Sequence, residues 1–378
     1  MMNKVFITRA ATITALADNL EDLWQRLLCR QSAVQPINRF STDSYYSHEA
    51  ACIDSLRSDG NISLVQPLID RLLENLGSVP VDTFLITATT KSGIDTLERL
   101  KKYTEADKHD ILLSYLPKLI SHKLNLNHQG ININAACASS TIAVAKAASL
   151  IAAGRISVAL VVGIDILTEF IFSGFSALRV LSPTTCKPFD KHRDGLNLGE
   201  GAAALLLMNE QRAKSDGITP IASLIGWGIA TDATHIIAPD INASGLIHAI
   251  RLALKKANVT PENIAGINAH GTGTFYNDLM EFNAFQAIFK NHMIPIHSVK
   301  GAIGHTLGAA GAIEIAIGIQ SLIHQIIPPT VGFNEPEQIT ATMISNSSVQ
   351  ISGNYLLKVN SGFGGINSAI ILGKGDSE

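Results

Sequence analysis

Short apolar runs alternate with longer amphipathic stretches along the whole chain, and this alternation constrains the fold more than any other feature. The short runs are rich in Val, Ile and Leu and predict strands, whereas the longer stretches show the spacing of helices. Strands that alternate with helices form sheets covered by helices, so we expect a layered α/β fold. The predicted strands are 5–8, 84–89, 130–136, 158–164, 201–208, 264–270, 294–299 and 368–373, and the predicted helices are 19–30, 141–154, 244–258 and 279–291.

The composition is that of a soluble globular protein, with 46% hydrophobic and 16% charged residues over a length of 378. A polar, Gly-containing segment at 209–219 follows a predicted strand and marks the expected seam between two halves, residues 1–215 and 216–378. INAAC (133–137) and INAHG (267–271) lie on either side of that seam, and each puts a reactive side chain after a strand. Open α/β sheets build their sites at such strand ends.

The charge pattern excludes two kinds of partner. The formal net charge is −3 without a long Lys or Arg run, so we expect no general surface for nucleic acid or anionic membrane.

No run reaches 18 uninterrupted apolar residues, and Arg9 interrupts the N-terminal stretch, so we expect neither a membrane span nor an export signal. The cysteines form no CxxC, which favours a reducing cytoplasm over disulfides or zinc; they are Cys29, Cys52, Cys137 and Cys186.

The stretch INAACASST (133–141) places one cysteine among alanines and serines, just after a predicted strand. Small neighbours let a substrate approach the Cys137 sulfur, and a helix N-terminus favours a thiolate. Cys137 is therefore a candidate nucleophile. A buried structural cysteine is the commoner role of a free thiol, and this stretch alone leaves that alternative open.

A second cluster is NAHGTGTFYND (268–278), where glycines surround His270. The hydroxyls of Thr272 and Thr274 are suited to holding an extended polar ligand. A lone histidine is more often structural than catalytic, but the strand-end setting favours a functional role here.

Two Gly-rich segments follow. In SVKGAIGHTLGAAGAIE (298–314), the helix start beside His305 disfavours its charged form, which predicts a neutral imidazole that can donate one hydrogen bond. Lys300 and Glu314 either form a buried pair that orients the loop or a solvated surface pair. The glycines of NSGFGGINSA (360–369) would bring backbone N–H groups near a ligand, with an ordinary tight turn as the alternative.

The four clusters together resemble the β-ketoacyl-acyl carrier protein synthases, condensing enzymes of the thiolase-like fold. CASS (137–140), NAHGTGT (268–274), KGAIGHTLGAAGAIE (300–314) and GFGG (362–365) occur in the family's order, and KPFDKHRDGLNLGEGAAALLL (187–207) extends the resemblance over nearly the whole chain. The resemblance implies an α/β, thiolase-like fold, in which two similar α/β halves form a five-layered α-β-α-β-α body.

By this resemblance, Cys137 carries the acyl group, and His270 and His305 bind the thioester oxygen of malonyl carrier protein during decarboxylative condensation. The backbone N–H groups of Cys137 and Phe363 would form an oxyanion hole, and the Phe363 ring would gate the site. The supporting residues implied are Thr272 and Thr274 for the phosphopantetheine arm, and Lys300 with Glu314 for the histidines. No metal ligand and no bound cofactor are expected, because the substrates travel on the phosphopantetheine of acyl carrier protein.

The resemblance also implies a homodimer, but the sequence departs from the family's usual pattern in several places, which leaves other assemblies and functions open. The usual glycine-rich start is missing, the region 50–120 is short, and GIDILTEFIFSGFSALRVLSPTTCKPFD (163–190) is more similar to synthases of specialised pathways such as aryl polyenes. Some of those pair with a chain-length-factor subunit, so a heterodimer is an alternative. A catalytically silent subunit and a cysteine acyltransferase without condensation are the competing functions. A thiolase is disfavoured, because no cysteine follows Cys186.

Overall fold

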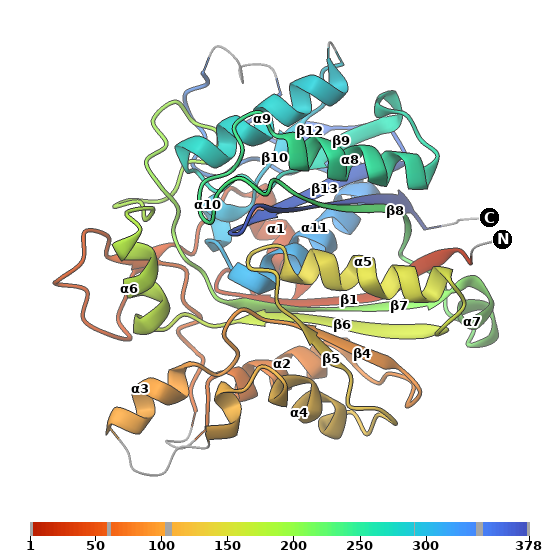
Figure 1. The fold of residues 1–378 in the computed structure, drawn as a ribbon, viewed down its shortest axis with the longest axis horizontal. Helices are drawn as coiled ribbons and strands as arrows, with labels where there is room; N and C mark the ends of the chain where they lie inside the picture. The colour runs from red at the N-terminus through yellow and green to blue at the C-terminus, as the bar shows by residue number, and fades with distance from the viewer. Residues whose placement is uncertain (1–2, 59–61, 103–107, 291, 338–342, 376–378) are drawn as a thin grey trace.

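The computed structural model describes residues 3–58, 62–102, 108–290, 292–337 and 343–375. In these residues ten strands form one continuous sheet in the order β10-β9-β13-β14-β8-β1-β7-β6-β4-β5 (Figure 1). Its strands are β1 (Val5–Thr14), β4 (Phe84–Ala88), β5 (Ile131–Ile133), β6 (Val158–Asp165), β7 (Gly201–Asn209), β8 (Ala222–Thr231), β9 (Ile264–Asn268), β10 (Ile296–His297), β13 (Tyr355–Gly362) and β14 (Ile366–Lys374). Short two-stranded ribbons join β2 (Gln35–Pro36) to β3 (Glu49–Ala50) and β11 (Ile326–Ile327) to β12 (Val349–Gln350).

The sheet consists of two halves with the same topology. Outward from the junction, the first half runs β1, β7, β6, β4, β5 and the second runs β8, β14, β13, β9, β10. In each half the inner two pairings are antiparallel and the outer two are parallel. The halves join where β1 and β8 pair through Phe6 with Ser223 and Ile7 with Ala222. The chain therefore repeats one α/β unit.

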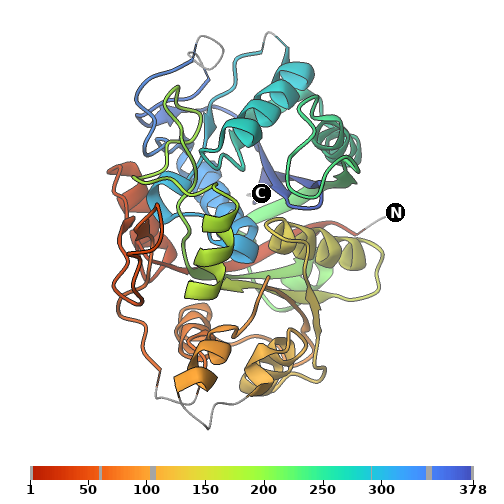
Figure 2. The ribbon, with the colours of Figure 1, turned by 60° about the vertical axis from the view of Figure 1, so that its left-hand side comes forward.

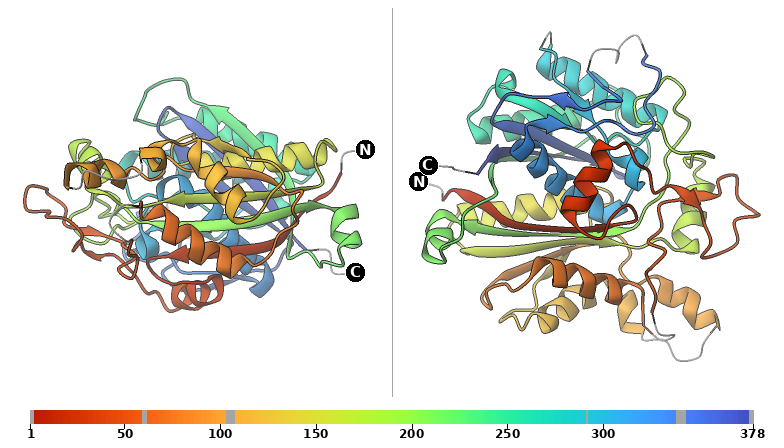
Figure 3. Two further views of the ribbon diagram at one scale, coloured as in Figure 1. Left: turned by 90° about the horizontal axis from the view of Figure 1, so that it is seen from below. Right: turned by 180° about the vertical axis from the view of Figure 1, so that it is seen from behind.

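Helices complete five layers (Figure 1). Helices α2 and α4 cover the outer face of the first half-sheet, α8 and α9 cover that of the second, and α5 and α11 lie between the two half-sheets. Figure 2 shows α6 along one side of the stack, and Figure 3 shows α1 beside α11 and the two termini on the same side. The helix bounds are α1 (Leu20–Leu28), α2 (Val65–Leu76), α3 (Asp95–Lys102), α4 (Tyr115–Lys123), α5 (Ser139–Ala152), α6 (Glu169–Ala177), α7 (Glu210–Ser215), α8 (Ser244–Ala257), α9 (Phe275–Phe289), α10 (Lys300–Ile303) and α11 (Ala310–His324).

Separate apolar cores lie between successive layers. The central core joins α5 and α11 to both half-sheets, a second packs α2 against the first half-sheet, and a third packs α8 and α9 against the second. Helix α11 is buried along almost its whole length and is correspondingly largely apolar, with Glu314 as its buried charge, whereas α5 buries most of its residues but exposes Lys146. The predicted five-layered thiolase-like fold is confirmed.

Most predicted elements are present, with shifted ends. The strand expected at 130–136 stops at Ile133, because the next residues turn into α5, and the strand expected at 294–299 is reduced to Ile296–His297. The polar segment 209–219 contains helix α7. The helix expected over 279–291 is α9, which begins earlier, at Phe275, and position 291 lies outside the described residues. Strands β8 and β13 were not predicted, since glycines interrupt the first and a lysine the second.

Helix α11 approaches α5 so closely that only glycine fits at Gly311. A Cβ at this position would lie 2.0 Å from Thr141 Oγ1 and 2.7 Å from the Thr141 backbone nitrogen. We expect Gly311→Ala to lower the free energy of unfolding by about 1–3 kcal/mol through overpacking. Gly318→Ala is the matched control on the same helix, because its Cβ would meet only the flexible tip of Leu372 at 3.1 Å. Equal urea-unfolding curves for the two variants would contradict this packing.

Candidate active site

Cys137 lies in a strained turn that leads from β5 into α5. The preceding residue, Ala136, has a φ of +49°, a conformation that costs a non-Gly residue free energy. The Ser139 hydroxyl stabilises the turn, accepting a hydrogen bond from the Ala135 N–H at 2.8 Å and donating one to the Ala136 carbonyl at 2.5 Å. Small residues tolerate this turn, which holds the Cys137 sulfur at the start of a central helix.

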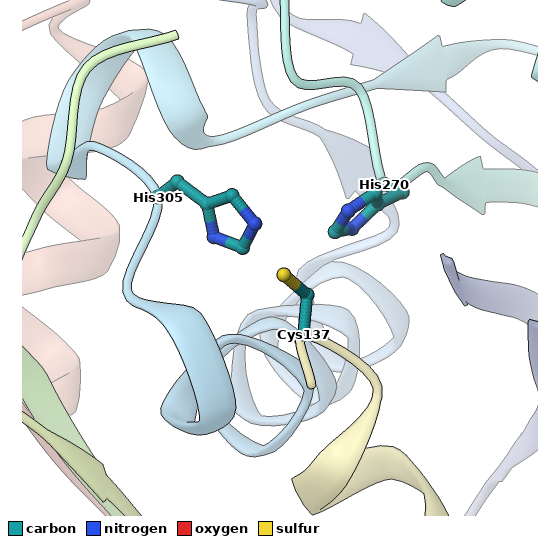
Figure 4. A group of neighbouring side chains, drawn as sticks. All are labelled: Cys137, His270 and His305. Atoms are coloured by element: carbon teal, nitrogen blue, oxygen red, sulfur yellow. The ribbon is translucent and has the colours of Figure 1, made fainter. Parts of the chain in front are cut away.

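Two histidines from the second half face that sulfur (Figure 4). His270 follows β9, and His305 lies in the loop before α11, so that Cys137 and His305 occupy corresponding loops of the two halves. The Cys137 Sγ and one ring nitrogen of each histidine lie within 4.8 Å of one another. The imidazole centroids are 5.2 Å apart with the rings at 83°. The fold therefore brings the three predicted residues together.

Hydrogen bonds at the rear of each ring fix the tautomers. The Leu307 N–H donates to His305 Nδ1 at 3.2 Å, and the Asn360 side-chain amide lies 3.0 Å from His270 Nδ1. Lys300 Nζ is 3.3 Å from the same His270 nitrogen. Since a lysine and an amide N–H can only donate, both Nδ1 atoms accept, and each neutral ring carries its proton on Nε2.

A buried carboxylate organises the rear of the site. Glu314 is 1% exposed, and its Oε1 lies 2.6 Å from Lys300 Nζ while its Oε2 lies 2.9 Å from Lys358 Nζ. Asn360 also donates to Oε2, at 2.8 Å. The predicted Lys300–Glu314 pair is thus buried, whereas the surface-pair alternative is wrong. Lys300 further donates to the His270 carbonyl.

Burial and these charges set the protonation states. Burial and the Lys300 cation lower the pKa of His305 to about 3, and the same two causes lower the pKa of His270 well below its usual value. The expected neutral imidazole at His305 agrees with this direction. The expectation that the helix start favours a Cys137 thiolate is wrong: burial raises the pKa of the thiol to about 12, against a smaller lowering by Lys300.

A cavity of about 470 Å³ opens onto the three side chains. Thr272, Thr274 and Phe363 line it, as predicted, and the two threonine hydroxyls lie 2.8 Å apart. Phe363 occupies the turn between β13 and β14, and its ring stacks on Phe175 with centroids 5.9 Å apart. A Cβ on the neighbouring Gly362 would lie 3.2 Å from the Cys137 nitrogen, so glycine brings the turn against the cysteine backbone.

Several supporting residues were missed in the sequence. Glu281 accepts hydrogen bonds from the N–H groups of His270 and Gly271 at 2.6 Å each, and Asp278 accepts from the Thr272 N–H at 3.1 Å. Their spacing of three residues in a helix directly after the histidine motif could have identified them. Lys358 could have been found as a charge that directly follows two leucines and precedes a valine in the sequence. Among the described residues, Cys137, His270 and His305 are the group with metal-ligand spacing, but their arrangement around a cavity equally suits a thiol and two hydrogen-bond donors.

The comparisons with known proteins identify the class. The β-ketoacyl synthase N-terminal domain matches residues 86–213, and the β-ketoacyl synthase C-terminal domain matches residues 221–334. A 3-oxoacyl-(acyl-carrier-protein) synthase 2 from Mycobacterium bovis is 30% identical over 407 residues, covering 98% of this chain and 97% of the relative. The chain belongs to the β-ketoacyl synthase family, which confirms the predicted family and the predicted acyltransferase class of condensing enzyme.

A further relative and two solved structures are similar to nearly the whole of this chain. The chloroplastic 3-oxoacyl-(acyl-carrier-protein) synthase I of Hordeum vulgare is 29% identical over 98% of this chain and 88% of its own length. The ishigamide ketosynthase/chain length factor superposes with a TM-score of 0.91 at 26% identity over 100% of both chains. The ketosynthase ApeO, solved with its chain length factor ApeC from Xenorhabdus doucetiae, gives 0.85 at 27% identity over 98% of both chains.

Within the part of the chain that the structure describes, one segment, Leu307–His324, is long and apolar enough to cross a bilayer. It is 83% buried between the half-sheets and includes Glu314, so it has the character of a core helix.

We expect Glu314→Gln to lower the free energy of unfolding by about 3–5 kcal/mol, because it leaves two buried lysine cations without their counter-charge. Glu210→Gln is the matched control, since it removes the same charge from an exposed pair with Lys214 in α7. Thermal denaturation followed by circular dichroism should show a clear loss for the first variant and no change for the second. Similar melting temperatures would mean that the lysines do not depend on Glu314.

Proposed function

We propose that this protein elongates an acyl chain by decarboxylative condensation with malonyl carrier protein, with Cys137 as the acyl-carrying nucleophile. One observation carries the proposal: a thiol and two neutral imidazoles, each with Nε2–H available, lie within 4.8 Å of one another in the lining of one cavity. A nucleophile and two donors are the groups that acyl transfer and enolate stabilisation need.

In the first step, Cys137 Sγ attacks the carbonyl of an acyl thioester on carrier protein. The new C–S bond forms, the bond to the phosphopantetheine sulfur breaks, and the thiol proton passes to the departing sulfur. The backbone N–H groups of Cys137 and Phe363 stabilise the oxyanion, and the Phe363 ring, stacked on Phe175, gates the cavity. Thr272 and Thr274, which line the same cavity, hold the phosphopantetheine arm.

In the second step, the malonyl thioester oxygen accepts hydrogen bonds from Nε2–H of His270 and His305. The bond to the carboxylate breaks, carbon dioxide leaves, and the electron pair forms an enolate that the two donors stabilise. The enolate carbon attacks the acyl-Cys137 carbonyl, and the Cys137 thiolate departs and takes a proton from water. Lys300 and Glu314 support the histidines, because Lys300 contacts both His270 and the carboxylate. The charge of Lys300 also helps to keep His305 neutral by lowering the pKa of that ring. No metal enters these steps.

The partner is acyl carrier protein, whose phosphopantetheine carries both substrates, so the protein needs no bound cofactor of its own. The relatives are named as synthases that act on acyl carrier protein, and ApeO was solved with a chain length factor. We infer a cytoplasmic homodimer, with a heterodimer containing a chain-length-factor-like subunit as the alternative. We also divide the chain into an N-terminal half, 1–215, that carries Cys137 and a C-terminal half, 216–378, that carries both histidines.

Cys137→Ala is expected to abolish both acyl loading and condensation without loss of folding, because a small residue replaces a small one in the turn. Cys29→Ala, which removes an exposed thiol, is the control and should leave both reactions intact. Intact-protein mass spectrometry after incubation with acyl carrier protein measures loading, and the mass of the carrier measures elongation. Unchanged elongation by the Cys137 variant would overturn the assignment of the nucleophile.

His305→Ala is expected to leave Cys137 open to acylation while malonyl decarboxylation falls about 100- to 1000-fold, as for loss of one oxyanion donor. Carbon dioxide release and acyl-enzyme formation are measured separately on the same preparation. If both steps fall equally, His305 does not act specifically on the malonyl thioester.

A further inference from the structure

Lys358 is a buried cation in strand β13. It lies in the middle of β13, and only 1% of the residue is exposed. Across the sheet it pairs with Asn268 of β9, which pairs in turn with His297 of β10. Residues in register share one face, so three polar side chains form a row toward α11. Burying such a row costs free energy, which raises the question of what Lys358 does there.

The Lys358 ammonium joins three elements behind His270. Its Nζ lies 2.9 Å from Glu314 Oε2 on α11, and it donates to the Val359 carbonyl on its own strand. It also lies 3.4 Å from the carbonyl oxygens of Asn268 and Ala269, at the end of β9. Ala269 directly precedes His270, so Lys358 holds the backbone that presents the imidazole.

A second connection runs through side chains. Glu314 Oε2 accepts from both Lys358 and the Asn360 amide, and the same amide nitrogen lies 3.0 Å from His270 Nδ1. The other oxygen of Glu314 is occupied by Lys300. Lys358 thus fixes the carboxylate oxygen that orients Asn360, and Asn360 helps to keep the His270 proton on Nε2, facing Cys137.

We propose that Lys358 is a positioning residue that holds the Nε2–H of His270 toward the malonyl thioester, acting through Glu314, Asn360 and the end of β9. This proposal rests on the condensation proposed above and adds a residue that acts on its second step alone.

The charge of Lys358 has a consequence for pH dependence. Its cation contributes to lowering the pKa of His270 and of His305, so its removal raises both pKa values and lets the rings protonate at higher pH. A ring that is protonated on both nitrogens can no longer accept a hydrogen bond at Nδ1 from Asn360 or Leu307, so the contact that orients the ring is lost. The charged and titratable groups around Lys358 are Glu314 on α11, Lys300 on α10, Glu281 on α9, His297 on β10, and His270 and His305 in the loops.

The test is Lys358→Met, which keeps an unbranched side chain only one heavy atom shorter and removes its charge. We expect malonyl decarboxylation to fall about 10- to 100-fold, which is the usual effect of removing a residue that orients a site residue without touching the substrate. The rate of Cys137 acylation should not change, and the acid limb of the condensation profile should move to higher pH. Lys358→Arg should retain the wild-type acid limb. Leu357→Met is the matched control, because Leu357 is also fully buried but lies in the outer core against α8 and α9.

If Lys358→Met does not fold, Lys358→Gln replaces it with the same expectation. Nitrogen-15 spectra of the histidine rings in the unaltered protein at pH 6 provide a measurement that needs no variant, and we expect neutral rings protonated on Nε2. Equal losses in acylation and decarboxylation, an unmoved acid limb, or a His270 ring protonated on Nδ1 would each overturn the proposal. If the unaltered protein releases no carbon dioxide from malonyl carrier protein, the proposed function itself fails, independently of Lys358.

Discussion

The shared carboxylate of Glu314 is the constraint on which the site depends. Two lysine cations and an amide converge on its two oxygens inside the protein, and each partner also contacts the segment that carries His270. A buried ion pair contributes little to stability by itself, but removal of one member is costly. The network therefore acts mainly as a positioning device, and the neutral state of the two imidazoles follows from its excess of positive charge together with burial.

The repeated topology explains why such a network can form. Helices α5 and α11 occupy the same place in their half-sheets and pack against each other at Gly311. The loops that precede them carry Cys137 and His305, so packing of the two central helices brings these loops together. Residues far apart in the chain meet because the fold brings the corresponding strand ends of the two halves close together. The alanines and glycines of the central helices permit this close approach.

The sequence was sufficient to predict the layered fold and the residues at the strand ends, because periodicity and small-residue motifs are local signals. Cys137, His270 and His305 stood in such motifs, and the structure brings them to one cavity. Lys358 and Asn360 were not predicted to support the histidines, since their roles depend on pairing between β13 and β9 and on contact with α11. The raised pKa of the Cys137 thiol was also missed, because burial by distant segments outweighs the effect of the local helix start.

The most direct test of the proposed chemistry is mass spectrometry of the unaltered protein and its carrier after mixing with acyl carrier protein, with and without malonyl carrier protein. We predict an acyl adduct on Cys137 without malonyl carrier protein and, with it, a carrier-bound β-ketoacyl product longer by one two-carbon unit. An adduct that is never extended would contradict condensation and favour simple acyl transfer. The absence of any adduct would contradict the role of Cys137 and favour a catalytically silent subunit.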